Sequence, residues 1–570
     1  MKSKKLLSSL LAVSMITSFA LVGCGNDEEG ASSNGGNTES GVDANQYLNL
    51  LLGSEPKTID PSKSTDSYSS MILTNTQECL TRIIQDENGN DKIIEGIAES
   101  WEKSEDGLTW TFHLRDAKWS DGEDLTAEQF EYGIKRTLAP ETASKYSFLL
   151  YPIANAEAYN KGQVSDGELG VKAIDSKTLE FKLGSQCPYF LDLTYFKVMQ
   201  PQRKDIIEKS GDIYGTEAET MVFSGPFAID EWVHNNKVIL SKNENYWDKD
   251  NVKLEKVTMK VISETNARMQ ELYSGSIDMA GVVKPEWIEK LNETGQFQVK
   301  DGYNGDVCYC FFNQAETIDG EKNIFSNLKV RQAFSLAQSR EEKISTLRKG
   351  LAEPAYSFVP PKVQIGGEDF RDKVNSSPLK ELKDQNPDPK ALLIEGLKEL
   401  GLGDDPSKVE VTYLFSGTDA DSKEWAEFEQ QNYQQTLGIK MNIEYVEWAV
   451  YDQRVKNGEY QYAAQAWTGD YNDPNTFLDF WVSTAGIMPT GWKNEEYDKC
   501  IDDAAKIDDP EERTKLFKRA EEILIKEDAV CSPESWRFRK TYIRNYVKNY
   551  SAPLFPGAID LKYTYTSGRK

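Results

Sequence analysis

Apolar and polar residues along the chain predict strands and helices in alternation. "LTWTFHL" (residues 108–114) alternates every second position, which predicts a strand. In "TAEQFEYGIKRTL" (residues 126–138), Thr126 is followed three positions later by Gln129, the capping-box pattern that opens a helix. "FAIDEWV" and "KVILSKN" flank the short turn "HNN" and predict a hairpin. The chain therefore mixes both kinds of element.

Five consecutive segments near the C-terminal end predict a parallel sheet. They are a strand, a helix, a strand, a helix and a strand, at residues 408–415, 421–437, 439–446, 448–457 and 460–467. A glycine, Gly438 or Gly458, stops each helix. This β-α-β-α-β order builds parallel sheets with right-handed crossovers. Ligands of open α/β sheets bind just beyond the carboxyl ends of strands. Asp470, three residues past the last predicted strand, therefore has the position of a ligand contact.

The stretch "AWTGDYNDPNTFLDFW" (residues 466–481) surrounds Asp470 with aromatic residues. A bare carboxylate is costly to desolvate, so we expect a positive group to meet it. The alternative is a structural turn, because Asp is common in turns. Asp473, which precedes Pro474, is expected to have that structural role.

The first residues have the pattern of a secretory signal peptide. A basic start precedes an apolar run from Leu6 to Val22. The ending "LVGC" resembles the bacterial lipobox, which implies cleavage after residue 23, a lipid on the Cys24 thiol and anchoring at the outer face of the cell membrane. Residues 24–45 are rich in Gly, Ser, Asn and acids, and predict a flexible tether. An ordinary signal peptide with an incidental Cys24 is the alternative.

Length and charge restrict the class of protein. A chain of 570 residues is expected to form two or three lobes. A net charge of −27 argues against a nucleic-acid partner. With only two histidines the chain is poorly supplied for a multi-His metal site, and we expect neither metal nor cofactor. Six further cysteines could pair in an exported protein, but we expect buried free thiols.

Several stretches resemble the solute-binding receptors of peptide ABC importers, the oligopeptide- and dipeptide-binding lipoproteins. These are "SEPKTIDP" (residues 54–61), "IIEGIAESWEKSEDGLTWTFHLRDAKWSDGEDLTAEQF" (93–130), "SGPFAIDEWVHNNKVILSKNENYWD" (224–248), "YSGSID" (273–278), "NLKVRQAFSLA" (327–337) and "WTGDYNDPNTFL" (467–478). The resemblance runs from about residue 48 to the C-terminus.

The resemblance implies an α/β fold of the type II periplasmic-binding-protein kind, in which two lobes with an extra inserted domain close on a hinge. Domain I would combine residues 46–80, 187–262 and 531–570. Domain II would be an insertion at 81–186, and domain III would span 263–530.

The resemblance also implies the site residues. In such receptors the Asp of the last motif pairs with the peptide α-ammonium, and Asp470 holds that position. Exposed strand edges would pair with the peptide backbone, a mode of binding that depends little on the identity of the peptide side chains. The expected edges and walls are Gly53, Ser54, Glu55, Ala466, Trp467, Thr468, Gly469, Tyr471, Trp448 and Trp481. Receptors for short peptides often carry a basic residue six positions before the motif Asp, where this chain has Ala464. Another Arg or Lys would then hold the peptide carboxylate, or longer peptides would leave the pocket.

The expected function is peptide capture and delivery to a membrane ABC permease with its ATPase subunits, by a monomer that is not an enzyme. The same fold could instead serve a nickel chelate, haem, an oligosaccharide or a peptide signal. A secreted glycoside hydrolase is the alternative from another class, since 93 acidic residues leave room for a carboxylate pair.

Overall fold

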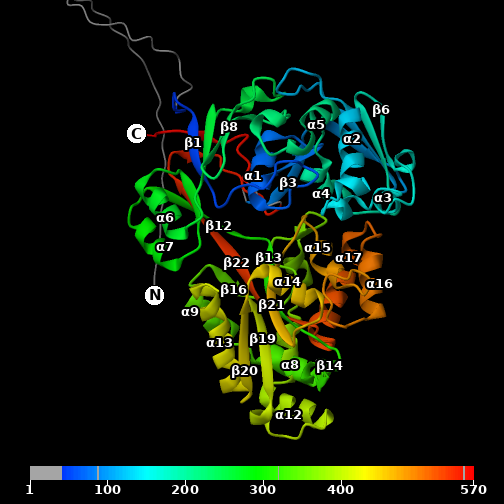
Figure 1. The fold of residues 1–570 in the computed structure, drawn as a ribbon, viewed down its shortest axis with the longest axis vertical. Coiled ribbons are helices and arrows are strands. Elements are labelled where there is room, and N and C mark those ends of the chain that lie inside the picture. Colours follow the sequence, from blue (N-terminus) through cyan, green and yellow to red (C-terminus); the bar gives the residue numbers. More distant parts are fainter. Residues whose placement is uncertain (1–40, 87–88, 319, 556–558, 570) are drawn as a thin grey trace, which may run out of the picture. The chain divides into compact units, whose positions relative to one another are not determined.

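A computed structural model describes residues 41–86, 89–318, 320–555 and 559–569. Cys24 and the predicted signal peptide lie outside these residues. Within them the strands form two four-stranded sheets, one eight-stranded sheet and several two-stranded ribbons (Figure 1). No helix of this described part is both long and apolar enough to cross a membrane.

The first sheet has the strand order β1-β10-β9-β8. Its strands are β1 (Tyr47–Leu52), β10 (Lys256–Val261), β9 (Lys237–Lys242) and β8 (Phe227–Val233). β8 and β9 form the hairpin expected from the sequence. Leu48, Leu50 and Leu52 alternate inward along β1 and are fully or almost fully buried, so this sheet presents one face to a core.

The second sheet has the order β4-β5-β7-β6. Its strands are β4 (Ala98–Lys103), β5 (Thr109–Leu114), β7 (Thr178–Lys182) and β6 (Val171–Asp175). Helix α2 (Ala127–Leu138) packs against β6 and β7. The Thr126 N–H at its start donates to Gln129 Oε1 at 3.0 Å, as the capping-box pattern predicts. We call these two sheets, with their helices and the ribbon β2 (Thr81–Gln85)–β3 (Asp91–Glu95), lobe 1.

The eight-stranded sheet contains the predicted β-α-β-α-β unit. The elements are β19 (Glu410–Ser416), α13 (Ala420–Thr436), β20 (Lys440–Val446), α14 (Trp448–Lys456) and β21 (Tyr462–Thr468). β19 is parallel to both β20 and β21, which confirms the prediction. β21 is antiparallel to β13 (Asp306–Phe312), which in turn pairs with β22 (Cys531–Arg544). We call the part built on these strands, up to Arg537 of β22, lobe 2.

Strand β22 connects the two lobes. Its first residues pair with β13 in lobe 2, and its last residues pair with β12 (Phe297–Tyr303) and β11 (Met279–Val282) beside lobe 1. Figure 1 shows it as one long red strand that leads from lobe 2 toward β1. The turn between β12 and β13 contains Gly305, whose positive φ of 67° favours glycine. The chain therefore crosses between the lobes twice, once in β22 and once from β12 to β13, and the two segments lie side by side.

The segment 263–292 has a small core of its own. Helices α6 (Thr265–Ser274) and α7 (Pro285–Asn292) pack with β11 around Met269 and Leu291, against Tyr542 of β22. The sequence boundaries assign this segment to domain III and all of β22 to domain I. Those boundaries stay predictions.

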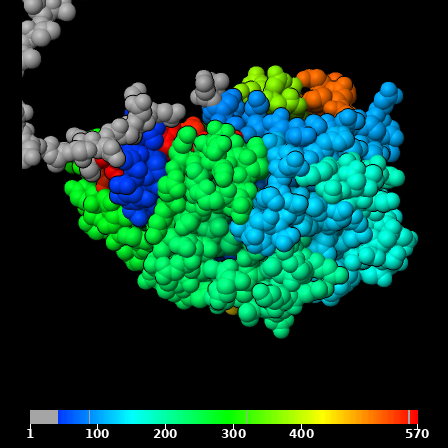
Figure 2. All heavy atoms as spheres, turned by 90° about the horizontal axis from the view of Figure 1, so that it is seen from above, coloured from blue at the N-terminus to red at the C-terminus, as the bar shows by residue number. Residues whose placement is uncertain are grey.

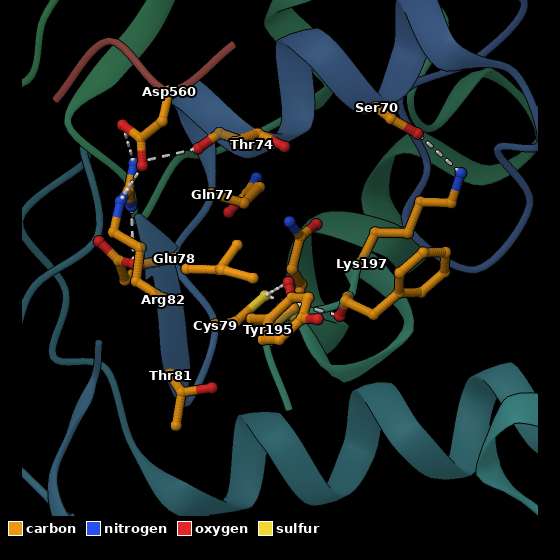
Figure 3. Close-up of a pocket in the computed structure, with 13 residues that line it drawn as sticks. Ser70, Thr74, Gln77, Glu78, Cys79, Thr81, Arg82, Tyr195, Lys197 and Asp560 are labelled. Atoms are coloured by element: carbon orange, nitrogen blue, oxygen red, sulfur yellow. Dashed lines mark hydrogen bonds and ion pairs between the residues drawn. The ribbon is translucent and has the colours of Figure 1, made fainter. Parts of the chain in front are cut away.

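Residues close to the C-terminal end complete lobe 1. Gln46 Nε2 donates to the Thr566 carbonyl at 2.9 Å, and from above the red C-terminal segment emerges beside the blue β1 (Figure 2). Deeper in lobe 1, Arg82 donates to both oxygens of Asp560, at 2.7 and 3.1 Å, and to Glu78 at 2.7 Å (Figure 3). All three side chains are buried. One guanidinium therefore satisfies two buried carboxylates.

The cysteines of the described residues are free thiols. Cys79, Cys187, Cys310, Cys500 and Cys531 are buried, as expected. Cys308 is only half-buried, because its side chain lies beside a cavity of lobe 2.

We predict that Arg82→Met lowers the free energy of unfolding by about 3–5 kcal/mol, because it leaves the Glu78 and Asp560 carboxylates buried without their partner. Lys515→Met is the matched control, since the pair of Lys515 with Glu512 is exposed and should contribute below about 1 kcal/mol. Urea unfolding of both variants measures the difference. Equal losses would show that the buried network contributes no more than a surface pair.

Candidate functional site

The loop after β21 holds Asp470 in a fixed place. β21 ends at Thr468, so Asp470 lies two residues past the strand rather than the three predicted. The Asp470 N–H donates to Thr476 Oγ1 at 3.0 Å, and Trp467 Nε1 donates to the Thr476 carbonyl at 2.7 Å. A Cβ on Gly469 would lie 2.8 Å from the rings of Phe477 and Phe555. Gly469 is therefore required for this close packing.

Asp473 has the structural role expected for it, and a second one. Its Oδ1 accepts from the Asn475 N–H at 2.9 Å, which is turn chemistry. Its two oxygens also accept from Arg513 of α17 (Pro510–Glu521), both at 2.8 Å. Both side chains are buried. The loop is thus fastened to α17 by a bidentate pair that the sequence did not reveal.

Asp470 differs from Asp473 in having no donor. No hydrogen bond or ion pair reaches its carboxylate from any described residue. Burial raises the pKa of Asp470 to about 7, and the Lys197 ammonium of lobe 1 offsets part of that rise. The nearby Asp479 also has its pKa raised to about 7, by burial and then by the charges of Asp470 and Asp473. The loop and the turn after it therefore carry two half-buried carboxylates, Asp470 and Asp479, in addition to the Asp473 carboxylate that Arg513 balances.

Lobe 1 supplies the groups that face this loop. Lys197 and Tyr146 both interact electrostatically with Asp470. The ring of Tyr189 stacks on Tyr471 with centroids 4.7 Å apart and planes 13° apart. Sequence reasoning missed Lys197, Tyr146 and Tyr189, because no local pattern marks residues that lie more than 270 positions from Asp470.

Further contacts join the lobes in this structure. Lys103 of lobe 1 forms an ion pair with Asp508 of lobe 2 at 2.6 Å. Gln364 Nε2 donates to the Asp91 carbonyl at 3.3 Å. Tyr471 itself packs into the hydrophobic core of lobe 1. The two lobes therefore touch around the loop that carries Asp470.

One edge of β21 is open beside the site. β13 pairs with the strand along its whole length, from Tyr462 to Thr468. On the other side, β19 pairs only with Tyr462 and Ala463, and the Tyr451 hydroxyl donates to the Ala464 carbonyl. Among the described residues no strand continues this edge from residue 465 to 468. The predicted edge at Ala466–Thr468 is therefore accessible, and both of its end residues are exposed.

A cavity of about 300 Å³ lies along this edge. Trp448, 58% exposed at the start of α14, lines it together with Trp425, Phe415 and residues 464–466. Arg348 also lines it, with its guanidinium 4.4 Å from the centre of the Trp425 ring. No acid pairs with Arg348 among the residues described. The cavity thus offers aromatic walls and one unpaired cation.

The second predicted edge, Gly53–Glu55, is arranged differently. The Gly53 carbonyl accepts from Arg268 at 2.8 Å. Glu55 turns toward the β8–β9 hairpin, where it accepts from Trp232 Nε1 at 2.9 Å and contacts His234 Nδ1 at 2.7 Å. Ser54 is exposed. No described contact joins these three residues to Asp470.

The two tryptophans of the motif differ from each other in burial. Trp467 is half-buried and packs on Phe480 with ring centres 4.4 Å apart. Trp481, expected as a wall, is 3% exposed and packs against Tyr309 and Phe358 in the core of lobe 2. The expectation for Trp481 is wrong, because the short helix after the loop turns that side chain inward.

Comparison with known proteins identifies the family. The model of the bacterial extracellular solute-binding proteins, family 5, matches residues 92–489. The oligopeptide-binding protein OppA of Bacillus subtilis is 32% identical over 97% of this chain and 98% of its own. A substrate-binding domain of an oligopeptide ABC transporter from Bacillus anthracis is 31% identical, with a TM-score of 0.75 over 93% of this chain and all of that one. Peptide-bound OppA of Listeria monocytogenes is 27% identical, with a TM-score of 0.74 over 92% of this chain and all of that one.

The chain therefore belongs to the bacterial extracellular solute-binding proteins of family 5. This is a family of binding proteins and not of enzymes, and its members act outside the cytoplasm. The α/β type II fold expected from the sequence is confirmed.

We predict that Asp470→Asn stabilises the ligand-free protein, and more so at high pH. The folded-state pKa of about 7 lies above the unfolded value, so the folded protein holds this proton between roughly pH 4 and 7. Above pH 7 the carboxylate is ionised in both states, and its burial cost is fully present. The gain in unfolding free energy should therefore rise by about 2 kcal/mol between pH 5 and pH 8.

The measurement is denaturant unfolding at both pH values, with Asp166→Asn at an exposed position as the control. A gain for Asp470→Asn that is the same at pH 5 and pH 8 would contradict a desolvated carboxylate.

Proposed function

We propose that this protein captures peptides between its two lobes and binds their α-ammonium group at Asp470. The main support is the state of the Asp470 carboxylate. It is desolvated and held just beyond the end of β21, and no described residue donates a hydrogen bond to it. A peptide ammonium would make a charge-assisted hydrogen bond with it. It would also keep Asp470 ionised at neutral pH, because an opposite charge nearby lowers the pKa of a carboxylic acid.

The open edge of β21 supports peptide as the solute. A peptide in an extended conformation can add to the backbone groups between residues 465 and 468 as a further strand. Main-chain hydrogen bonds of this kind are independent of side-chain identity. Trp448 and Phe415 would then provide apolar walls for the peptide side chains in the adjoining cavity. Several relatives are named as oligopeptide- or dipeptide-binding proteins, which agrees with this solute.

The unpaired Arg348 is our candidate partner for the carboxylate end of the peptide. Ala464 leaves no cation at the position expected from the family resemblance, but it lines the same cavity as Arg348. The guanidinium lies 4.4 Å from the centre of the Trp425 ring, and the planar fork of N–H donors on an arginine matches the two oxygens of a carboxylate. A peptide bound at Asp470 and running along β21 would extend toward this group.

The receptor would act as a monomer at the outer face of the cell membrane. We infer a monomer whose single site lies between two lobes of one chain, and which delivers peptides to a membrane ABC permease. A lipid on Cys24 would hold it at the outer face of the membrane, with residues 24–45 as the tether. The related Bacillus anthracis structure, a substrate-binding domain of an oligopeptide ABC transporter, supports this setting.

We predict that Asp470→Asn weakens peptide binding by roughly 2–5 kcal/mol, the usual cost of removing one partner from a buried charge pair. Acetylating the peptide α-amino group should weaken binding to the unchanged protein by a similar amount. The two losses should not add, because both remove the same interaction. Calorimetry on the four combinations tests this.

The Asp470 contact would be refuted if free and acetylated peptides bind the unchanged protein equally. Asp479→Asn, in the next turn of the chain, is a suitable comparison, because it also removes a half-buried carboxylate with a raised pKa but should leave the effect of acetylation in place.

We predict that Cys24→Ser abolishes lipid attachment, so that the protein is released from cells or left unprocessed. Fractionation with and without detergent, and mass measurement of the N-terminal peptide, would detect the change. Retention of Cys24→Ser in the detergent-soluble membrane fraction, at the level of the unchanged protein, would contradict the anchor.

A further inference from the structure

Lys197 is a buried cation whose role the fold alone does not explain. It begins a short helical turn, Lys197–Met199, in lobe 1 and is 7% exposed. Its ammonium donates to Ser70 Oγ at 3.0 Å, as Figure 3 shows, and lies 4.9 Å from the centre of the Tyr146 ring. No carboxylate forms an ion pair with it among the described residues. A buried lysine without such a partner is unusual in a protein interior.

Two carboxylates from different lobes face this ammonium at longer range. Burial lowers the pKa of Lys197 to about 8, while the charges of Asp66 and Asp470 raise it. Lys197 therefore remains mostly charged at pH 7. Asp66 is occupied at the start of α1 (Ser67–Thr76), where it accepts from the Ser69 N–H and hydroxyl, both at 2.8 Å. Asp479 lies near Asp470, whose charge contributes to its raised pKa. The junction thus holds one cation, Lys197, among carboxylates that burial makes costly to ionise.

The Lys197 ammonium also has N–H groups that donate to no described residue. An ammonium has three N–H groups, and in the described residues only Ser70 accepts from this one. A solute group placed between the lobes next to Lys197 would be attracted if it were a carboxylate or a carbonyl. It would be repelled if it were a second cation, because like charges in a partly desolvated site repel strongly.

We propose that Lys197 determines which first residue a bound peptide can have: it disfavours lysine and arginine, and accepts neutral or acidic side chains. This inference rests on the proposed function, because it requires the peptide α-ammonium at Asp470, the carboxylate that faces Lys197. The α-ammonium would bring one positive charge to Asp470. A basic first side chain would bring a second one into the same space.

The test uses tetrapeptides X-Ala-Ala-Ala in which X is norleucine, lysine or glutamate, at pH 7. Norleucine has the carbon chain of lysine without its amine, so the ratio of the two dissociation constants isolates the charge. The unchanged protein should prefer norleucine over lysine by roughly 10- to 100-fold, and should bind the glutamate peptide at least as well as the norleucine peptide. In Lys197→Met the preference for norleucine should fall to within about twofold or reverse.

Two further variants separate this effect from general changes of charge or folding. Lys172→Met removes an exposed lysine of lobe 1 on β6, and should keep the ratio of the unchanged protein. Lys197→Arg keeps the charge and should also preserve the ratio. Because each ratio is measured within one variant, a partial loss of folded protein cancels. If Lys197→Met does not fold, the ratio in the unchanged protein still decides, since no discrimination there refutes the inference.

The outcomes distinguish this inference from the proposed function. If N-acetylated and free norleucine peptides bind the unchanged protein equally, the Asp470 contact itself is wrong. If acetylation weakens binding but lysine and norleucine peptides bind alike, Asp470 keeps its role and Lys197 has none. If Lys197→Met still prefers the norleucine peptide over the lysine peptide, the role of Lys197 is refuted and the role of Asp470 is unaffected.

Discussion

The structure depends on one strand, β22, that pairs with strands on both sides of the junction between the lobes. β22 pairs with β13 in lobe 2 and, a few residues later, with β12 and β11 beside lobe 1. At the crossing, Arg537 of β22 donates to Asp306 at the start of β13, with Nε 2.9 Å from Oδ2. Because the two crossing segments are hydrogen-bonded to each other, the lobes are joined by a narrow ribbon. Relative movement of the lobes must be taken up in that ribbon, which is the geometry of a hinge.

Two carboxylates of the candidate site, Asp473 and Asp470, differ in their hydrogen-bond partners. Asp473 is satisfied by Arg513 and by the turn, and it holds the loop in shape. Asp470, three residues earlier, receives no hydrogen bond from any residue that the structure describes, although burial penalises its charge. A protein selected only for stability would not keep such a group. The proposed ammonium contact would explain the unsatisfied charge as stability given up for binding, which is common at functional sites.

Much of this arrangement could be predicted from the sequence, because it depends on local patterns. The β-α-β-α-β unit, the capping box of α2 and the β8–β9 hairpin each follow from residues close together in the chain. Asp470 could be located because strand ends mark ligand positions in this kind of sheet. The remainder depends on tertiary contacts. Lys197 and Tyr189 reach the loop from lobe 1, and the direction of Glu55 is decided by a hairpin nearly 180 residues away.

The placement of the C-terminal residues has a consequence for the order of folding. Thr566 accepts from Gln46, and Asp560 holds Arg82, across sequence separations of 520 and 478 residues. Loops of that length are entropically costly to close, and contacts of such long range slow folding. The first sheet and the buried charges beside it therefore cannot reach their final state while the chain is still being synthesised. Within lobe 2, only the unit from β19 to β21, whose strands lie within 59 consecutive residues, depends on short-range contacts and can form earlier. Its pairing through β13 to β22 must also wait for the C-terminal part of the chain.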